Sequence, residues 1–118
     1  MLPRIWRERL QDILEAITEI QTFTEGMNFE AFAADKKTMR AVELDLIVIG
    51  EAANQIPDHI EEENPEIPWS LMRAMRNRLV HVYFAVDARL LWDTIQKDLP
   101  VLFSALQSIW KTKNTARE

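Results

Sequence analysis

The sequence predicts an all-α protein, an up-and-down bundle of four to five helices. The 118 residues include only 2 glycines and 5 prolines, too few for a turn-rich β-protein. Apolar residues also recur at helical spacing over long segments of the chain. A hydrophobic content of 47% at this length is enough for one core and too little for two. We therefore expect a single helical domain over residues 1–111 and a polar, frayed tail over residues 112–118.

The first half of the chain is expected to hold two long helices. The first should begin after Pro3, a favourable first-turn residue, and end at Gly26, with a short helical turn following over residues 28–34. Asp35 is a suitable N-cap for the second helix, which should continue to about Ile56 because Pro57 stops it. This second helix is apolar over more than one face. That pattern indicates burial by the core on one side and by a partner subunit on another.

The second half should contain an irregular connection and two further helices. Residues 57–68 are expected to be irregular apart from one helical turn over residues 58–63. A third helix should open at Trp69 or Ser70. Asp87 should cap a fourth helix that runs towards Lys111, and Pro100 should kink or split it. All four tryptophans occur at helical spacing with other apolar residues, so we expect them in the core: Trp6, Trp69, Trp92 and Trp110.

Composition argues against several classes of function. The chain has no cysteine, which excludes disulfides, a thiolate nucleophile and cysteine-ligated zinc. No apolar run is long enough to span a membrane, and the N-terminal residues become charged at once, so we expect a cytoplasmic protein. The net charge of −5 argues against binding nucleic acid through a global field. His59 has no matched ligands nearby in the sequence; we expect it to face solvent, and we expect neither a metal site nor a cofactor.

Charge is distributed unevenly along the chain. Residues 41–66 contain eight acidic residues and no lysine or arginine, whereas residues 71–90 contain four arginines and one acidic residue. Two interpretations of the acidic segment stay open. It is either a solvated helix face and loop or a surface that meets a basic partner.

The strongest indication of function is the sequence RNRLVHVY at residues 76–83, which holds one of the two histidines and the only tyrosine. Arg76 offers a planar fork of donors that matches phosphate oxygens. Asn77 and His81 are i, i+4 neighbours, so the amide could fix the tautomer of the imidazole. His81 could take the proton from an RNA 2′-hydroxyl while Arg76 holds the charge that builds on the phosphorus oxygens. A second His81 could return a proton to the leaving oxygen, so this set of side chains is a reasonable one for cleaving RNA without a metal ion.

A helical projection separates this motif from the core. The apolar stripe of the third helix consists of Leu71, Met75, Leu79, Val82 and Val86. The outward face carries Arg73, Arg76, Asn77, Val80 and His81, with Phe84 also on it. Apolar side chains among polar ones on an outward face suggest cover by a second copy of the chain, with Val80 and Phe84 at the dimer interface. Such a homodimer would bring two copies of His81 and Arg76 into one cleft.

Less specific interpretations of the same residues remain open. A histidine with asparagine four residues before it is commonly a surface or interface pair. The arginines could be ordinary salt-bridge donors to Glu51 or Glu43, and Tyr83 could be a phenol at the edge of the core.

Residues 76–83 resemble the Arg-x(4–6)-His motif of HEPN domains, with the extra x-Tyr of the HepT branch. The segment Ile49-Gly50-Glu51-Ala52-Ala53, closed by Ile56-Pro57, is similar to the "IGEAA…IP" segment of that branch. Further residues fall where the family usually has them, so that the resemblance spans about residues 35–102: Trp69, Asp87, Trp92 and Asp98-Leu99-Pro100. The chain departs from the family pattern at Val82, where Gly or Asp is common, and at Ala74, where Gly is common. Both departures lie away from the predicted catalytic face.

The resemblance implies a homodimeric ribonuclease that acts as the toxin of a toxin–antitoxin module, with its active site in a cleft at the dimer interface. By position, Arg76 and His81 would be catalytic, and Asn77 and Arg73 would support them. The resemblance further implies an antitoxin similar to MntA, a minimal nucleotidyltransferase that transfers AMP from ATP onto Tyr83. The alternative hypothesis is a non-catalytic helical partner of such a nucleotidyltransferase, with the motif as its docking or modification site. A structural bundle within an assembly is the third hypothesis.

Overall fold

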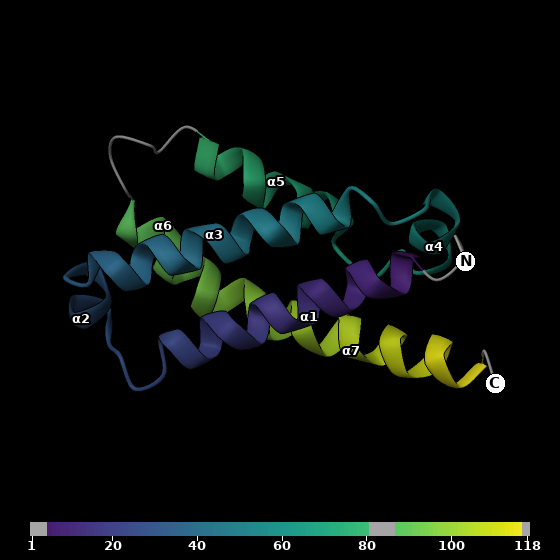
Figure 1. The fold of residues 1–118 in the computed structure, drawn as a ribbon, viewed down its shortest axis with the longest axis horizontal. Coiled ribbons are helices and arrows are strands. Elements are labelled where there is room, and N and C mark those ends of the chain that lie inside the picture. The colour runs from purple at the N-terminus through teal and green to yellow at the C-terminus, as the bar shows by residue number, and fades with distance from the viewer. Residues whose placement is uncertain (1–4, 81–86, 117–118) are drawn as a thin grey trace.

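The computed structural model describes residues 5–80 and 87–116, with side chains placed for residues 6–76 and 87–111. Its long helical segments alternate in direction along a molecule of 46 × 28 × 24 Å (Figure 1). They are α1 (Ile5–Phe23), α3 (Lys36–Ala53), α5 (Trp69–Val80), and a last segment made of α6 (Ala88–Asp93), the π-helical turn η2 (Thr94–Asp98) and α7 (Leu99–Ala116). Short helices α2 (Phe29–Ala33) and α4 (Asp58–Glu63) lie in the connections. The predicted all-α, up-and-down bundle is confirmed.

Helix α1 forms because its apolar residues recur every three or four positions and fill one face. The side chains of Leu10, Ile13, Ile17 and Ile20 on that face are fully buried. The helix ends as predicted close to Gly26, whose φ of +79° is a left-handed conformation that favours glycine.

Helix α3 begins at its predicted cap. The carboxylate of Asp35 accepts hydrogen bonds from the backbone N–H of Thr38 at 3.0 Å and from its hydroxyl at 2.8 Å. The hydrogen bond from the backbone N–H of Thr38 is the main cause that holds the pKa of Asp35 below its usual value.

The end of α3 differs from the prediction, because the helix stops at Ala53 and not at about Ile56. The chain leaves it through a tight turn in which the N–H of Ile56 donates to the carbonyl of Ala53 at 3.2 Å. Pro57 then serves as the N-cap of α4 with an extended backbone. Proline disfavours a helical conformation at the residue before it, so the helix ends ahead of Ile56.

The last helical segment is interrupted as predicted, and the interruption is a π-helical turn, not a simple kink. Pro100 is the second residue of α7 and has no N–H to donate to the preceding turn. The wider turn η2 lies directly before it. Helix α7 then continues to Ala116, beyond the end near Lys111 that the sequence predicted.

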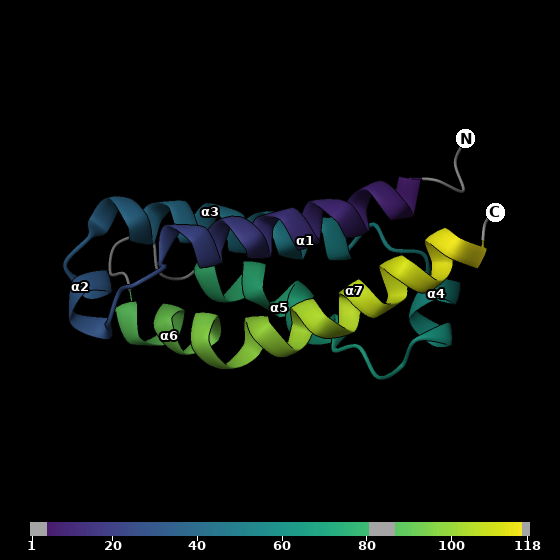
Figure 2. The same cartoon turned by 90° about the horizontal axis from the view of Figure 1, so that it is seen from below.

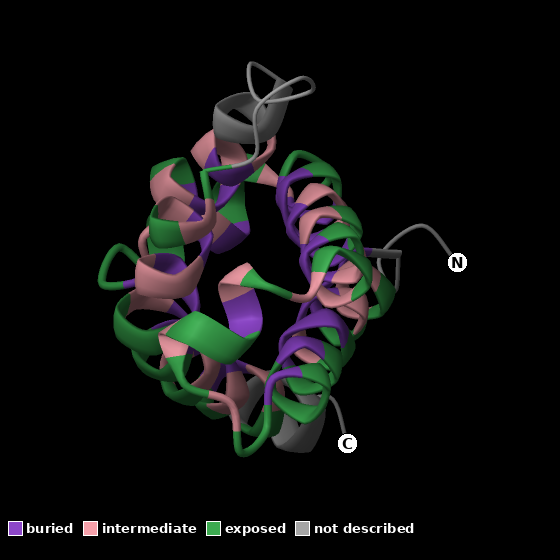
Figure 3. Ribbon diagram, turned by 90° about the vertical axis from the view of Figure 1, so that its left-hand side faces the viewer, coloured by how far each residue is buried: buried purple, intermediate pink, exposed green. Residues whose placement is uncertain are grey.

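Helix α3 lies between α1 and α5, and α7 packs against α1 (Figures 1 and 2). Seen end on, the buried residues face the interior and the exposed residues face outwards (Figure 3). Trp6 and Trp69 are buried as predicted, whereas Trp92 and Trp110 are half-buried at the edge of the core. None of the helices in the described part of the chain is long and apolar enough to cross a membrane.

Candidate functional site

Helix α5 carries the described part of the predicted site and presents it away from the core. Met72 and Met75 are buried, whereas Arg73 and Arg76 are half-exposed on the other side of the helix. Met75 and the two arginines lie as the helical projection predicts, whereas Met72, which the projection did not place on the core stripe, is fully buried, and Leu71, which it did, is only half-buried. Among the described elements, α5 packs chiefly against α3, so α3 fixes the position of these arginines.

The two helices approach most closely at Gly50. A Cβ atom added there would lie 2.6 Å from the Cβ of Arg76 and 3.2 Å from the carbonyl oxygen of Met72. Ordinary contacts between carbon atoms are about 3.5 to 4.0 Å, so a larger residue would push the helices apart. Glycine therefore lets the backbone of α5 rest directly on α3 at the residue that bears the candidate catalytic guanidinium.

The next residue on α3, Glu51, forms an ion pair with Arg76 between its Oε2 and the guanidinium Nε. The two side chains keep 49% and 43% of their surface exposed. The salt bridge to Glu51 that the sequence left open is thus present, whereas Glu43 pairs instead with Arg40 at 3.1 Å. Glu51 contacts Nε, so this contact does not use the N–H bonds of the two terminal amino groups. These N–H bonds form the edge of the guanidinium that can donate two parallel hydrogen bonds to a phosphate.

Arg73 also has an acidic partner. Its Nη1 lies 2.6 Å from Oε2 of Glu61 on α4, and this pair is less exposed than the one at Arg76. Arg73 and Glu61 both line a hollow of about 420 Å³ between α4 and the start of α5. The acidic segment of residues 41–66 therefore meets a basic surface at two points, and that surface belongs to the same chain.

The other predicted site residues lie at or beyond the end of α5. The backbone of Asn77 and Val80 is helical, but their side chains are outside the described part. His81, Tyr83 and Phe84 lie outside the described residues. His59 is exposed on α4, as expected.

A buried acidic residue, not predicted from the sequence, lies between α1 and α3. Asp45 is only 8% exposed, and its Oδ2 has no hydrogen-bond partner within the described part of the chain. Burial, and secondarily the neighbouring carboxylate of Glu19, raise the pKa of Asp45 to about 7. Its position between Val42 and Ile49 on the core-facing side of α3 was the available signal, because a charged residue there interrupts an apolar stripe.

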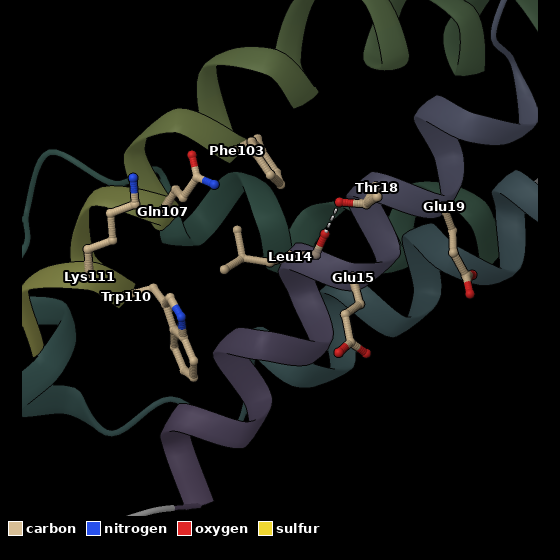
Figure 4. A pocket seen from close by; sticks show the side chains of 8 residues that line it. All are labelled: Leu14, Glu15, Thr18, Glu19, Phe103, Gln107, Trp110 and Lys111. Carbon is tan, nitrogen blue, oxygen red and sulfur yellow. Dashed lines mark hydrogen bonds between the residues drawn. The ribbon is translucent and has the colours of Figure 1, made fainter. Parts of the chain in front are cut away.

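The large groove between α1 and α7 is separate from this site. Its volume is about 620 Å³, and neither Arg73 nor Arg76, the predicted site residues whose side chains the structure describes, lines it. Leu14 of α1 and Phe103 and Trp110 of α7 surround the space between the two helices (Figure 4). The predicted site on α5 is instead a surface of the single chain, built around Arg76 and its acidic partner.

Comparisons with known proteins bear on this surface. A family model described as "Ribonuclease HepT-like" matches residues 13–109. "Probable ribonuclease HepT" of Thermococcus cleftensis is 44% identical over 110 residues, which are 93% of this chain and the whole of that relative. "Putative RNase MJ0127" of Methanocaldococcus jannaschii is 37% identical over 105 residues, 89% of this chain and 87% of the relative.

A third relative, "Putative RNase TTE0752" of Caldanaerobacter subterraneus, is 34% identical over 103 residues, 87% of this chain and 92% of the relative. No solved structure gave a significant match. The region matched by the family model contains the whole of α3 and α5, and with them the pair of Glu51 and Arg76.

Proposed function

Since this chain belongs to the HepT-like ribonuclease family and is itself a ribonuclease, we propose that it cuts RNA without a metal ion, as the toxin of a toxin–antitoxin module. The observation that carries the proposal is the placement of Arg76. Its guanidinium is half-exposed on the outward face of α5, is held at Nε by Glu51, and precedes His81 by five residues. A planar guanidinium held in one orientation can stabilise the charge that builds on the oxygens of a phosphodiester during its cleavage, and an imidazole can transfer the proton.

The proposed reaction is an intramolecular transesterification of RNA. His81 accepts the proton of the 2′-hydroxyl, the 2′-oxygen attacks the phosphorus, and the bond from phosphorus to the 5′-oxygen breaks. A second His81, from the other copy of the chain, gives a proton to the leaving 5′-oxygen. Arg76 stabilises the charge on the non-bridging oxygens, Asn77 fixes the tautomer of His81, and Arg73 adds positive charge nearby. The products end in a 2′,3′-cyclic phosphate and a 5′-hydroxyl.

A second copy is proposed to cover α3 and α5. Leu44 lies two turns before Glu51 on the same side of α3 and has 62% of its surface exposed, and Ile47 is half-buried. Helix α5 runs antiparallel to α3 (Figure 1), and Gly50 packs against Arg76. Since Leu44 precedes Gly50 on α3, it lies nearer than Gly50 to the C-terminal end of α5. An exposed leucine there supports a two-fold interface that includes Val80 and Phe84.

Control by a nucleotidyltransferase antitoxin completes the proposal. The phenol of Tyr83 gives up its proton to solvent, and its oxygen attacks the α-phosphorus of ATP. The bond between the α-phosphorus and the oxygen that bridges to the β-phosphorus breaks, so that pyrophosphate leaves and AMP remains on the tyrosine. Tyr83 is two residues after His81 in the sequence. The added bulk and negative charge would therefore block the phosphate site beside Arg76.

The test of cleavage compares the wild type with Arg76→Ala and His81→Ala, each purified without an antitoxin. The wild type should cut RNA in the presence of a chelator and leave 2′,3′-cyclic phosphate ends. Each variant should lose about a hundredfold or more in rate, as expected for a lost acid–base or charge-stabilising group. Arg40→Ala, which removes an exposed arginine of α3, is the matched control and should keep full activity. Variants as active as the wild type, or cleavage that stops with the chelator, would contradict the proposal.

The alternative, a non-catalytic partner of a nucleotidyltransferase, predicts a different combination of results. Intact mass after co-expression with such an enzyme should show one or more added AMP units, and Tyr83→Phe should lose them. The alternative holds if this modification occurs and the unmodified protein does not cut RNA. Absence of any mass shift under ATP-replete conditions would remove Tyr83 as the regulated residue.

A further inference from the structure

The contact between α3 and α5 places an acidic side chain directly on the candidate catalytic arginine. Gly50 brings the two backbones together at Arg76, and Glu51 then reaches the Nε of that arginine. Glu51 and Arg76 are 25 positions apart in the sequence, so only the packing of the helices creates this pair. Of the two predicted catalytic residues, Arg76 is the one whose side chain the structure describes.

Stability alone does not explain this ion pair. Both side chains keep nearly half of their surface in solvent. Exposed ion pairs of this kind contribute little to folding, because water screens the attraction and two long side chains lose freedom. The contact between the helices rests mainly on buried residues such as Met72, Met75 and Ile49. A role for Glu51 should therefore be sought in what it does to the guanidinium.

We propose that Glu51 is a positioning residue that orients Arg76 for the phosphate of RNA, an inference that rests on the proposed function. A free arginine side chain samples many rotamers, and each must be frozen when the guanidinium binds phosphate. A carboxylate on Nε fixes the plane of the guanidinium before RNA arrives. The two terminal amino groups, with four N–H bonds, then form the edge offered to the phosphate oxygens.

The negative charge of Glu51 has a second, opposing effect. A carboxylate beside a phosphate-binding arginine repels the RNA backbone and weakens ground-state binding. The orientation of Arg76 stabilises chiefly the transition state, because charge builds on the phosphorus oxygens there. The repulsion between Glu51 and the RNA phosphate, in contrast, already weakens the binding of the substrate. Glu51 should therefore raise kcat and also raise KM, a combination that a merely structural residue does not produce.

The experiment measures kcat and KM for cleavage of one defined RNA oligonucleotide by the wild type, Glu51→Ala and Glu51→Gln. Glu51→Ala loses both the orienting acceptor and the charge, so kcat should fall by about tenfold while KM also falls. Glu51→Gln keeps an acceptor oxygen for Nε without the charge. It should recover kcat to within about threefold of the wild type and retain the lowered KM.

Asp12→Ala is the matched control. Asp12 accepts a hydrogen bond from the Nε of Arg9 at 2.9 Å on the surface of α1. Its replacement therefore removes one negative charge and one carboxylate contact to an arginine Nε, as Glu51→Ala does, but away from Arg76. Both kinetic constants should stay at the wild-type values. A fall in KM equal to that of the Glu51 variants would show that net charge alone is responsible and would overturn the proposal. Thermal unfolding of each variant checks that it is folded at the assay temperature.

Two outcomes separate this inference from the proposed function. An active wild type with an unchanged kcat in Glu51→Ala, or a Glu51→Gln variant as slow as Glu51→Ala, overturns only the positioning role. A wild type that does not cut RNA overturns the proposed function. In that case the Nε–H resonance of Arg76 in ¹⁵N NMR still tests the pairing. It should exchange slowly with water in the wild type and in Glu51→Gln, and fast exchange in the wild type would overturn the orientation itself.

Discussion

Replacing Gly50 by alanine should separate α3 from α5 at the arginine that the proposed reaction uses. The added Cβ would lie 2.6 Å from the Cβ of Arg76, and the backbone nitrogen of Arg76 and the carbonyl oxygen of Met72 are each only 3.2 Å away. Two of these three neighbours are backbone atoms, so no side-chain rotation relieves the clash. Helix α5 must move by about 1 Å to restore an ordinary carbon–carbon contact.

The expected cost follows from two opposing terms. Overpacking of a tight contact costs about 1 to 3 kcal/mol. Alanine in the interior of a helix recovers about 0.5 to 1 kcal/mol relative to glycine. The middle of these two ranges gives a fall of about 1 kcal/mol in the free energy of unfolding for Gly50→Ala, which for a domain of this size corresponds to a fall in Tm of about 4 °C.

Gly26→Ala is the control, because it should lower the free energy of unfolding by a similar amount through backbone strain and not through a clash between helices. Gly26 has a φ of +79° and open space around it, so alanine there meets no atom but adopts a disfavoured conformation that costs about 1 to 2 kcal/mol. Both variants should unfold at lower urea concentration than the wild type. Only Gly50→Ala should displace Arg76 from Glu51 and slow RNA cleavage, by about tenfold to a hundredfold.

A Gly50→Ala protein as stable as the wild type, or more stable, would refute this account of the helix contact. An unstable variant that cleaves RNA at the wild-type rate under folding conditions would refute the link between the helix contact and Arg76. Equal losses of activity in Gly50→Ala and Gly26→Ala would attribute the effect to stability alone.

Three further predictions concern other parts of the molecule. The pKa of Asp45 rises from an ordinary value of 3.8 to about 7 on folding, so the folded chain binds this proton more tightly and stability should fall as pH rises from about 4 to about 7. Urea unfolding at pH 5 and pH 8 should show this fall in the wild type, and Asp45→Asn should reduce it; an unchanged difference would exclude Asp45 as the cause. Val80→Glu or Phe84→Glu should leave the monomer folded and abolish the dimer in light scattering, and a wild type that is already monomeric would contradict the shared cleft. Asp87 accepts from the N–H of Leu90 at 2.9 Å, so Asp87→Ala should lower the free energy of unfolding by about 1 kcal/mol in urea titration, and no change would show that this cap is dispensable.

Local rules predicted most of the secondary structure. The caps at Asp35 and Asp87 are where the sequence placed them, because a short carboxylate that accepts from the first turn is recognisable without tertiary context. The end of α3 was misplaced by three residues, since Pro57 acts on the residue before it and the helix closes with a tight turn. The effect of Pro100 was predicted, but the π turn that absorbs it was not.

For the candidate site, periodicity predicted which side of α5 faces outwards, and this is confirmed for Arg73, Arg76 and Met75. The roles of His81 and Tyr83 stay predictions. The sequence offered both Glu51 and Glu43 as partners of the arginines, with no means of choosing between them. Only the crossing of the helices selects Glu51, because Gly50 sets the point of closest approach.

Most of the helices, the resemblance to a ribonuclease family and the motif that carries Arg76 and His81 could be recognised from the order of the residues. These features depend on residue order and on short-range spacing, which a single chain displays directly. The contact between Glu51 and Arg76 and the burial of Asp45 beside Glu19 arise only when the helices pack against one another. Both contacts join different helices, and the approach of helix backbones depends on how all the side chains between them pack.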